Sequence, residues 1–216
     1  MALNVCEIFF SLQGESTFAG LPCVFVRLFG CNLACSWCDT LYAKDQAEES
    51  RSMELAAILE DIEAFGCSLV EITGGEPLLQ QETTILIKQL VEKGFKVLLE
   101  TNGSLSIDRV PQECVRILDI KCPSSSESHK NMYANLELLT QADQVKFVIA
   151  DSDDYRFARR IIKRLGHIPG EHIHLSPVSG TIAPEQIARW MLQDRLGARL
   201  SLQLHKIIWN PEKRGV

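Results

Sequence analysis

The chain has 216 residues, 46% of them hydrophobic, which is enough for one sizeable core and favours a single domain spanning residues 1–216. Its net charge of −6 and pI of about 5.4 argue against a nucleic-acid binder, which usually presents a basic face. No apolar run is long enough to cross a membrane, and the start MALNVCEIFF lacks the features of a signal peptide. We therefore expect a cytoplasmic protein with reduced thiols and neither a nucleic-acid nor a membrane partner.

Short apolar runs alternate with amphipathic stretches along the chain. Strands are expected at 23–29, 69–73, 96–101, 115–120, 144–150, 172–176 and 200–205. Helices are expected at 53–66, 79–92, 133–139, 155–165 and 184–196, where apolar residues recur at helical spacing. In the first helix Ser52 is a candidate N-cap and Gly66 a candidate stop.

Strands and helices that alternate in this way indicate a parallel sheet covered by helices. Six or seven units are fewer than the eight of a closed barrel, so an incomplete (β/α) barrel of about six parallel strands fits best. A doubly wound open sheet fits the periodicity almost as well. In both folds the carboxyl ends of the strands form the functional edge. Polar segments expected there are 31–40, 73–77, 100–103, 119–125, Lys146 and 203–206.

The segment 31–40 reads CNLACSWCDT and places Cys31, Cys35 and Cys38 at C-x3-C-x2-C spacing. Thiolates bind both zinc and iron–sulfur clusters. Structural zinc needs four ligands, commonly from two C-x2-C pairs, and only one such pair stands here. Three cysteines on a [4Fe–4S] cluster would leave one iron open to a small molecule. Interleaved Asn, Ser and Asp residues make a plain buried core a weak explanation.

This spacing, with an aromatic residue before the last cysteine, resembles the radical S-adenosylmethionine superfamily. The resemblance implies a [4Fe–4S] cluster on Cys31, Cys35 and Cys38, with S-adenosylmethionine bound at the open iron. It also implies that this cofactor is contacted by Trp37, Cys38, Asp39, Gly74, Gly75, Glu76, Pro123, Ser124 and Ser125. By their pattern alone, the paired glycines indicate only a turn and 123–125 only a loop.

Further motifs resemble one family of that superfamily, the 7-carboxy-7-deazaguanine synthases. They stand in order at 11–15, 27–40, 73–77, 100–103, 119–125 and 203–206. The resemblance implies a lyase of queuosine and deazapurine biosynthesis that contracts the ring of 6-carboxy-5,6,7,8-tetrahydropterin to 7-carboxy-7-deazaguanine and releases ammonia. It also implies Mg²⁺ at Thr40, a homodimer, and a flavodoxin or ferredoxin as electron donor.

The same resemblance implies substrate contacts from Leu12, Gln13, Gly14, Glu15, Arg27, Thr73 and His205. The residue types suit a pterin. A carboxylate accepts hydrogen bonds from two donors of the ring, and an amide both donates and accepts. A guanidinium donates two parallel hydrogen bonds to the substrate carboxylate. By pattern alone, 9–16 is a hairpin turn and His205 a structural residue on a strand end. Ser16 stands where relatives often have Gly, so a left-handed backbone there would be strained.

Two other functions remain open on the residues. A radical activase that installs a glycyl radical on a partner protein shares the cysteine spacing but has no need of Gln13, Glu15 and Arg27. A zinc-stabilised binding module would be colourless and would need a fourth protein ligand.

Overall fold

The computed structural model describes residues 1–45, 50–210 and 213–215. Within these ranges nine strands form one sheet, in the order β3-β1-β2-β4-β5-β6-β7-β8-β9. Seven strands are parallel: β2 (Pro22–Leu28), β4 (Leu69–Gly74), β5 (Lys96–Thr101), β6 (Val115–Asp119), β7 (Gln144–Ile149), β8 (Ile173–Pro177) and β9 (Arg199–Leu200). Two strands extend the sheet antiparallel beyond β2, namely β1 (Ala2–Leu12) and β3 (Arg51–Glu54).

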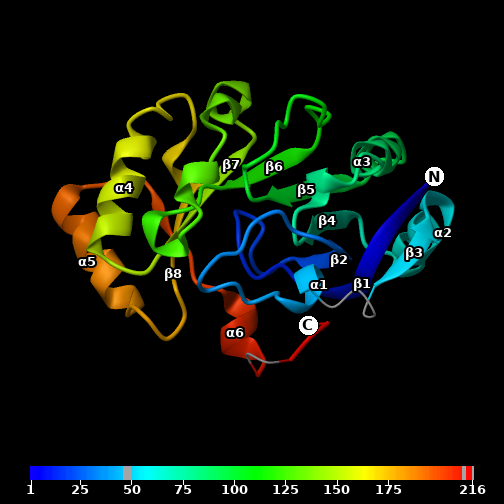
Figure 1. The fold of residues 1–216 in the computed structure, drawn as a ribbon, viewed down its shortest axis with the longest axis horizontal. Coiled ribbons are helices and arrows are strands. Elements are labelled where there is room, and N and C mark those ends of the chain that lie inside the picture. The colour runs from blue at the N-terminus through cyan, green and yellow to red at the C-terminus, as the bar shows by residue number, and fades with distance from the viewer. Residues whose placement is uncertain (46–49, 211–212, 216) are drawn as a thin grey trace.

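The parallel strands follow one another in chain order, and the sheet has β3 and β9 as its two edges. A doubly wound sheet would reverse its strand order at a switch point, so that alternative is excluded. Figure 1 shows the strands in an arc, with the loops after β1 and β2 on its inner side. The incomplete (β/α) barrel is therefore confirmed, with six parallel strands and a two-residue seventh.

The outer side of the arc carries four helices (Figure 1): α2 (Leu55–Ala64), α3 (Thr83–Glu92), α4 (Ser152–Ile162) and α5 (Pro184–Asp194). Their apolar faces and the outward residues of the strands form the main core. The loop after β2 carries the short helix α1 (Tyr42–Asp45), and α6 (Leu204–Ile208) lies near the end of the chain. No helix among the described residues is long and apolar enough to span a bilayer.

Alternation along each strand decides which residues face the inside of the arc. On β4, Leu69, Glu71 and Thr73 face inward, whereas Val70 and Ile72 pack into the outer core. The amino-terminal half of the inner face is filled by a second apolar cluster of Cys23, Phe25, Leu69, Leu98, Val115 and Ile117. The carboxyl-terminal half is polar, so the inner face has an apolar floor beneath a polar chamber.

Several element boundaries differ from the sequence-based expectations. Ser52 lies in β3, and α2 begins after Glu54 without a side-chain cap, so the predicted N-cap is wrong. Gly66 follows α2 with φ +64, as expected for a stop. The predicted helix 133–139 is a 3-10 helix, Tyr133–Leu138. The predicted strand 200–205 is mostly wrong, because β9 ends at Leu200 and α6 follows, which puts His205 on a helix.

Candidate active site

A cavity of about 460 Å³ occupies the polar half of the inner face. It brings together segments that lie far apart in the sequence, as expected for the carboxyl ends of parallel strands. Among its lining residues are most of the predicted site: Leu12, Gln13, Gly14, Glu15, Arg27, Cys31, Cys35, Trp37, Cys38, Asp39, Thr40, Thr73, Gly74, Gly75 and His205. Glu76, Pro123, Ser124 and Ser125 are predicted site residues that do not line it.

The three cysteines lie in the loop that leaves β2, and all three thiols are free. The backbone N–H of Cys38 donates to the carbonyl of Cys35 at 3.2 Å, which turns the chain tightly between them. Burial raises the pKa of Cys31 and of Cys35. Among the described residues, no group of three or more His, Cys, Asp or Glu side chains is arranged to hold a single metal ion. The three thiols instead share the wall of a larger space.

The glycine pair after β4 is required by close backbone contact with the cysteine loop. A Cβ atom on Gly74 would overlap the backbone of Leu28, and one on Gly75 would overlap the carbonyl of Gly30. The N–H of Gly75 donates to the carbonyl of Leu28 at 3.1 Å, and that of Glu76 to the carbonyl of Gly30 at 2.7 Å. The pair therefore fixes the first cysteine next to the end of β4, besides any contact to a ligand.

Glu76 is fully buried and does not line the cavity, whereas the resemblance places it at the cofactor. Its carboxylate accepts from the backbone N–H of Leu78 at 3.0 Å, from that of Asn102 at 2.7 Å, and from the hydroxyl of Thr101 at 2.9 Å. Burial raises the pKa of Glu76, while these donors lower it. Asn102 in turn lies 3.8 Å from the sulfur of Cys31 through its Nδ2. The carboxylate thus ties the segment after β5 to the first cysteine.

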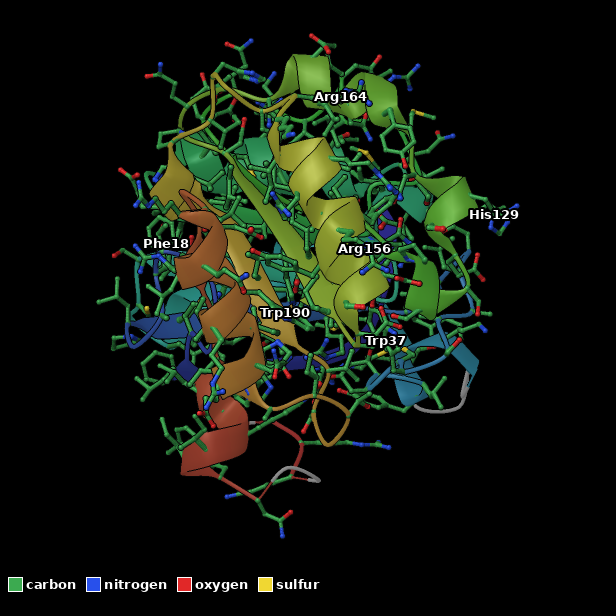
Figure 2. The ribbon with its side chains drawn as sticks, turned by 90° about the vertical axis from the view of Figure 1, so that its left-hand side faces the viewer. Phe18, Trp37, His129, Arg156, Arg164 and Trp190 are labelled. Carbon is green, nitrogen blue, oxygen red and sulfur yellow. The ribbon has the colours of Figure 1, made fainter. Side chains whose placement is uncertain are left out.

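The loop 123–125 is a 3-10 helix that stands behind Trp37 rather than in the cavity. The indole Nε1 of Trp37 donates to the hydroxyl of Ser124 at 3.2 Å. The backbone N–H of Ser124 donates to buried Asp154 on α4 at 3.0 Å, and its hydroxyl donates to the same carboxylate at 2.5 Å. Figure 2 shows Trp37 near the N-terminal end of α4, where this chain of bonds ends. The structure thus uses this loop to hold the indole that lines the cavity.

An ion network lines the same cavity, around the buried side chain of Lys146. Its Nζ is 2.5 Å from Oε2 of Glu15 and 2.9 Å from Oε1 of Glu100. Burial opposes the charge of Lys146, but the two carboxylates raise its pKa well above the usual value. The hydroxyl of Thr73 donates to Glu100 at 3.3 Å, and Nε2 of Gln203 donates to Glu15 at 2.7 Å. The first and last parts of the chain thus meet at one network.

Arg27 lies on β2 at the cavity wall and is held by a residue that the sequence did not single out. Its Nε donates to Glu7 at 2.8 Å, and the hydroxyl of Tyr42 donates to the same oxygen at 2.8 Å. Burial alone would lower the pKa of Arg27, but Tyr42 and Glu7 raise it. The bond to Glu7 uses Nε and fixes the plane of the guanidinium.

Several lining residues escaped the sequence-based prediction because their side chains look ordinary in one dimension. Glu71 and His174 lie inside apolar strands, where only period-2 alternation would assign them to the inner face.

Asp119 and Lys121 form an ion pair at 2.9 Å, and Nζ of Lys121 stands 5.6 Å from the ring centre of Trp37. Oδ1 of Asp119 is buried without a hydrogen-bond partner among the described residues.

Comparisons with known proteins agree with this arrangement. Residues 26–120 match the family model of the Radical SAM superfamily. The chain is 46% identical over 217 residues to the 7-carboxy-7-deazaguanine synthase of Chlorobaculum tepidum, covering 99% of this chain and 97% of that protein. It is 42% identical over 228 residues to that of Koribacter versatilis, covering 99% and 100%.

The fold is similar to the crystal structure of QueE from Escherichia coli, with a TM-score of 0.78, 23% identity and 94% coverage of both chains. That likeness supports the incomplete barrel, and the full-length identities above support the motif resemblance. The chain therefore belongs to the 7-carboxy-7-deazaguanine synthase family of the radical SAM superfamily.

Proposed function

We propose that this protein converts 6-carboxy-5,6,7,8-tetrahydropterin to 7-carboxy-7-deazaguanine with loss of ammonia, as a radical SAM carbon–nitrogen lyase of queuosine and deazapurine biosynthesis. One observation carries the proposal: a single cavity is lined by three free thiols, by the ion network around Lys146 and by Arg27. Such a cavity can hold a cluster, a cofactor and a small polar substrate in contact.

The residues present fit a [4Fe–4S] cluster and S-adenosylmethionine. Cys31, Cys35 and Cys38 would hold three irons, which leaves the fourth for the cofactor. The indole of Trp37 and the backbone of the glycine pair line the adjacent wall, and Oδ1 of Asp119 offers an unused acceptor for a nucleoside hydroxyl. When bound, these two groups supply the radical that takes a hydrogen atom from the substrate.

Mg²⁺ fits the rim of the cavity beside the cluster site. The hydroxyl of Thr40 lies 3.7 Å from the sulfur of Cys38 and offers one oxygen ligand. Mg²⁺ usually keeps several waters and takes few protein ligands, so one hydroxyl together with a substrate carboxylate is a reasonable set. When bound, the ion would orient that carboxylate and neutralise part of its charge.

The chain's own residues would bind and orient the pterin. Arg27, with its plane fixed by Glu7, would take the substrate carboxylate, and Glu15 and Thr73 would contact the ring. His205 packs against Gly14, where a Cβ atom would overlap its ring, so the absence of a side chain at Gly14 lets α6 close on the cavity. Burial lowers the pKa of His205, so it would act as a neutral hydrogen-bonding group.

A single domain spanning residues 1–216 would carry this reaction in the cytoplasm. A cluster on Cys31, Cys35 and Cys38 would need reduced thiols, which supports a reducing compartment. A cluster held by these cysteines would need one electron before it could activate the cofactor, so we propose a flavodoxin or ferredoxin as partner. The family resemblance supports a homodimer.

The test is an anaerobic assay of the reconstituted protein with dithionite, S-adenosylmethionine, Mg²⁺ and 6-carboxytetrahydropterin. We expect 7-carboxy-7-deazaguanine by mass spectrometry, and at least a tenfold loss of kcat/KM in Arg27→Ala. Formation of 5′-deoxyadenosine without the deazapurine would overturn the substrate assignment and favour a radical activase. A colourless protein with zinc in place of iron and sulfide would overturn the radical chemistry itself.

A further inference from the structure

Glu71 is a buried carboxylic acid in the wall of the cavity whose role the proposed function does not explain. It lies on the inner face of β4, at the level where the apolar floor meets the polar chamber, and only 4% of its surface is exposed. Its neighbour one step down the same face is Leu69, and one step up is Thr73. An acid at such a position is costly unless its polar atoms are satisfied.

Glu71 is bonded to Gln13, and this bond together with one from the backbone of Glu15 orients the amide of Gln13. Oε2 of Glu71 accepts from Nε2 of Gln13, and Oε1 of Gln13 accepts from the backbone N–H of Glu15 at 3.0 Å. Because a backbone N–H can only donate, the amide oxygen must face Glu15 and the NH₂ group must face Glu71. Gln13 is itself 3% exposed, and these two bonds hold its amide in one orientation.

The hydrogen bonds from Glu71 through Gln13 end at Glu15, whose carboxylate we propose contacts the substrate ring. Glu15 is held by Gln13 at its backbone, by Lys146 at one oxygen and by Gln203 at the other. The turn that carries it is closed by the N–H of Gly20, which donates to the carbonyl of Gln13 at 2.8 Å. Glu71 therefore holds Gln13 in place, and Gln13 in turn fixes the backbone position of Glu15.

We propose that Glu71 is a positioning residue for pterin binding, acting through the amide of Gln13 to fix the carboxylate of Glu15 that contacts the substrate ring. The role rests on the proposed function, because it assumes that the cavity binds the pterin.

The charged groups around Glu71 indicate in which protonation state it positions Gln13 and Glu15. The groups that face it are Glu100 from β5, Glu15 from the loop after β1, Lys146 from β7 and Cys23 from β2. Burial, then Glu100, raises the pKa of Glu71 to about 8, while Gln13 and Lys146 lower it. Cys23 stays a neutral thiol because burial raises its pKa. Glu71 is therefore mostly neutral at pH 7, and above pH 8 it adds a negative charge next to two carboxylates that share one lysine.

The test compares Glu71→Gln with Glu71→Leu in the holoenzyme. The amide of Glu71→Gln keeps an oxygen for Gln13 and mimics the neutral acid, so its KM for the pterin should stay within about threefold of wild type at pH 7. Glu71→Leu removes the bond to Gln13, so its KM should rise at least tenfold while kcat changes less. Formation of 5′-deoxyadenosine without substrate should be equal in all three proteins, because the thiols lie elsewhere.

The pH profile separates positioning from a merely structural role. Wild-type KM should rise above pH 8, up to tenfold per pH unit, whereas that of Glu71→Gln should stay flat to pH 9. An unchanged KM in Glu71→Leu, or parallel profiles for wild type and Glu71→Gln, would overturn the role. If Glu71→Leu does not fold, the pH profiles of KM for wild type and Glu71→Gln are sufficient to test the role. A wild-type protein that makes no deazapurine would instead overturn the proposed function and this role with it.

Discussion

The carboxylate of Glu76 offers the sharpest test of how the site is assembled. Exchanging it for an amide in Glu76→Gln changes one oxygen to an NH₂ group and alters nothing else in size. One oxygen of Glu76 accepts from the N–H of Leu78 and the other from the N–H of Asn102. Whichever way the amide turns, its NH₂ group must face a backbone N–H, so one donor is left without an acceptor.

The expected cost follows from these contacts. A lost bond to a charged group is worth about 1.5–3 kcal/mol, and a buried donor without a partner costs about 1–3 kcal/mol more. Removing the buried charge offsets part of this loss of stability, because burial raises the pKa of Glu76 and so disfavours its ionised form. We expect a net loss of about 2–4 kcal/mol, which lowers the Tm of a chain of this length by about 5–15 °C.

The assay is thermal and urea denaturation at pH 7, together with iron and sulfide content after reconstitution. Iron content should fall as well, because Asn102 joins Glu76 to Cys31. Glu60→Gln, on the exposed side of α2, is the matched control and should behave as wild type. A Glu76→Gln protein within 1 kcal/mol of wild type, with a full cluster, would refute this reasoning.

Three further predictions concern stability. Ser16 has φ +63, so in urea denaturation Ser16→Gly should be more stable than Ser16→Ala by about 1 kcal/mol, since both lose the bond from the N–H of Phe18 and only alanine keeps the strained backbone; equal stabilities would contradict this. Glu71 titrates near pH 8 when folded and near 4.5 otherwise, so its contribution to stability is complete below pH 4.5 and is lost as the pH rises through 8. The free energy of unfolding of Glu71→Gln should therefore rise relative to that of wild type by roughly 1.4 kcal/mol per pH unit between pH 4.5 and 8 in urea denaturation. A difference that stays constant over this range would argue against the pKa shift of Glu71. Asp143 is buried against Arg116, so Asp143→Asn should cost about 3–5 kcal/mol in urea denaturation, and adding Arg116→Met should restore part of it; no recovery would contradict an ion-pair origin.

The distinction between Glu71 and Glu76 shows why contacts decide the effect of one substitution. Both are buried glutamates in the same segment, and the same change to glutamine puts an NH₂ group in place of one carboxyl oxygen in each. Glu71 meets one amide that a neutral side chain can still satisfy, whereas Glu76 meets backbone donors on both oxygens. The sequence E-I-T-G-G-E contains no sign of this difference, since it arises from which strand or loop lies opposite each side chain.

Local patterns in the sequence were sufficient for much of the molecule. The spacing of Cys31, Cys35 and Cys38 and the alternation of apolar strands with helices are properties of short segments, so they predicted the cluster motif and the parallel sheet. Because parallel strands point the same way, the sequence is enough to place the polar segments after them on one edge of the sheet. The structure brings most of those segments to one cavity.

Long-range contacts decided the rest. Residues 200–205 have a strand-like pattern, yet the N–H of Leu204 donates to the carbonyl of Gly14, and the chain turns into α6 beside the first loop instead of extending β9. Lys146 could be assigned to a strand from sequence, but not to a position between Glu15 and Glu100, which are 131 and 46 residues away. Motif spacing and hydrophobic period are local and can be read along one chain. The pairing of buried polar groups depends on which side chains face each other across the barrel, so only the tertiary structure determined it.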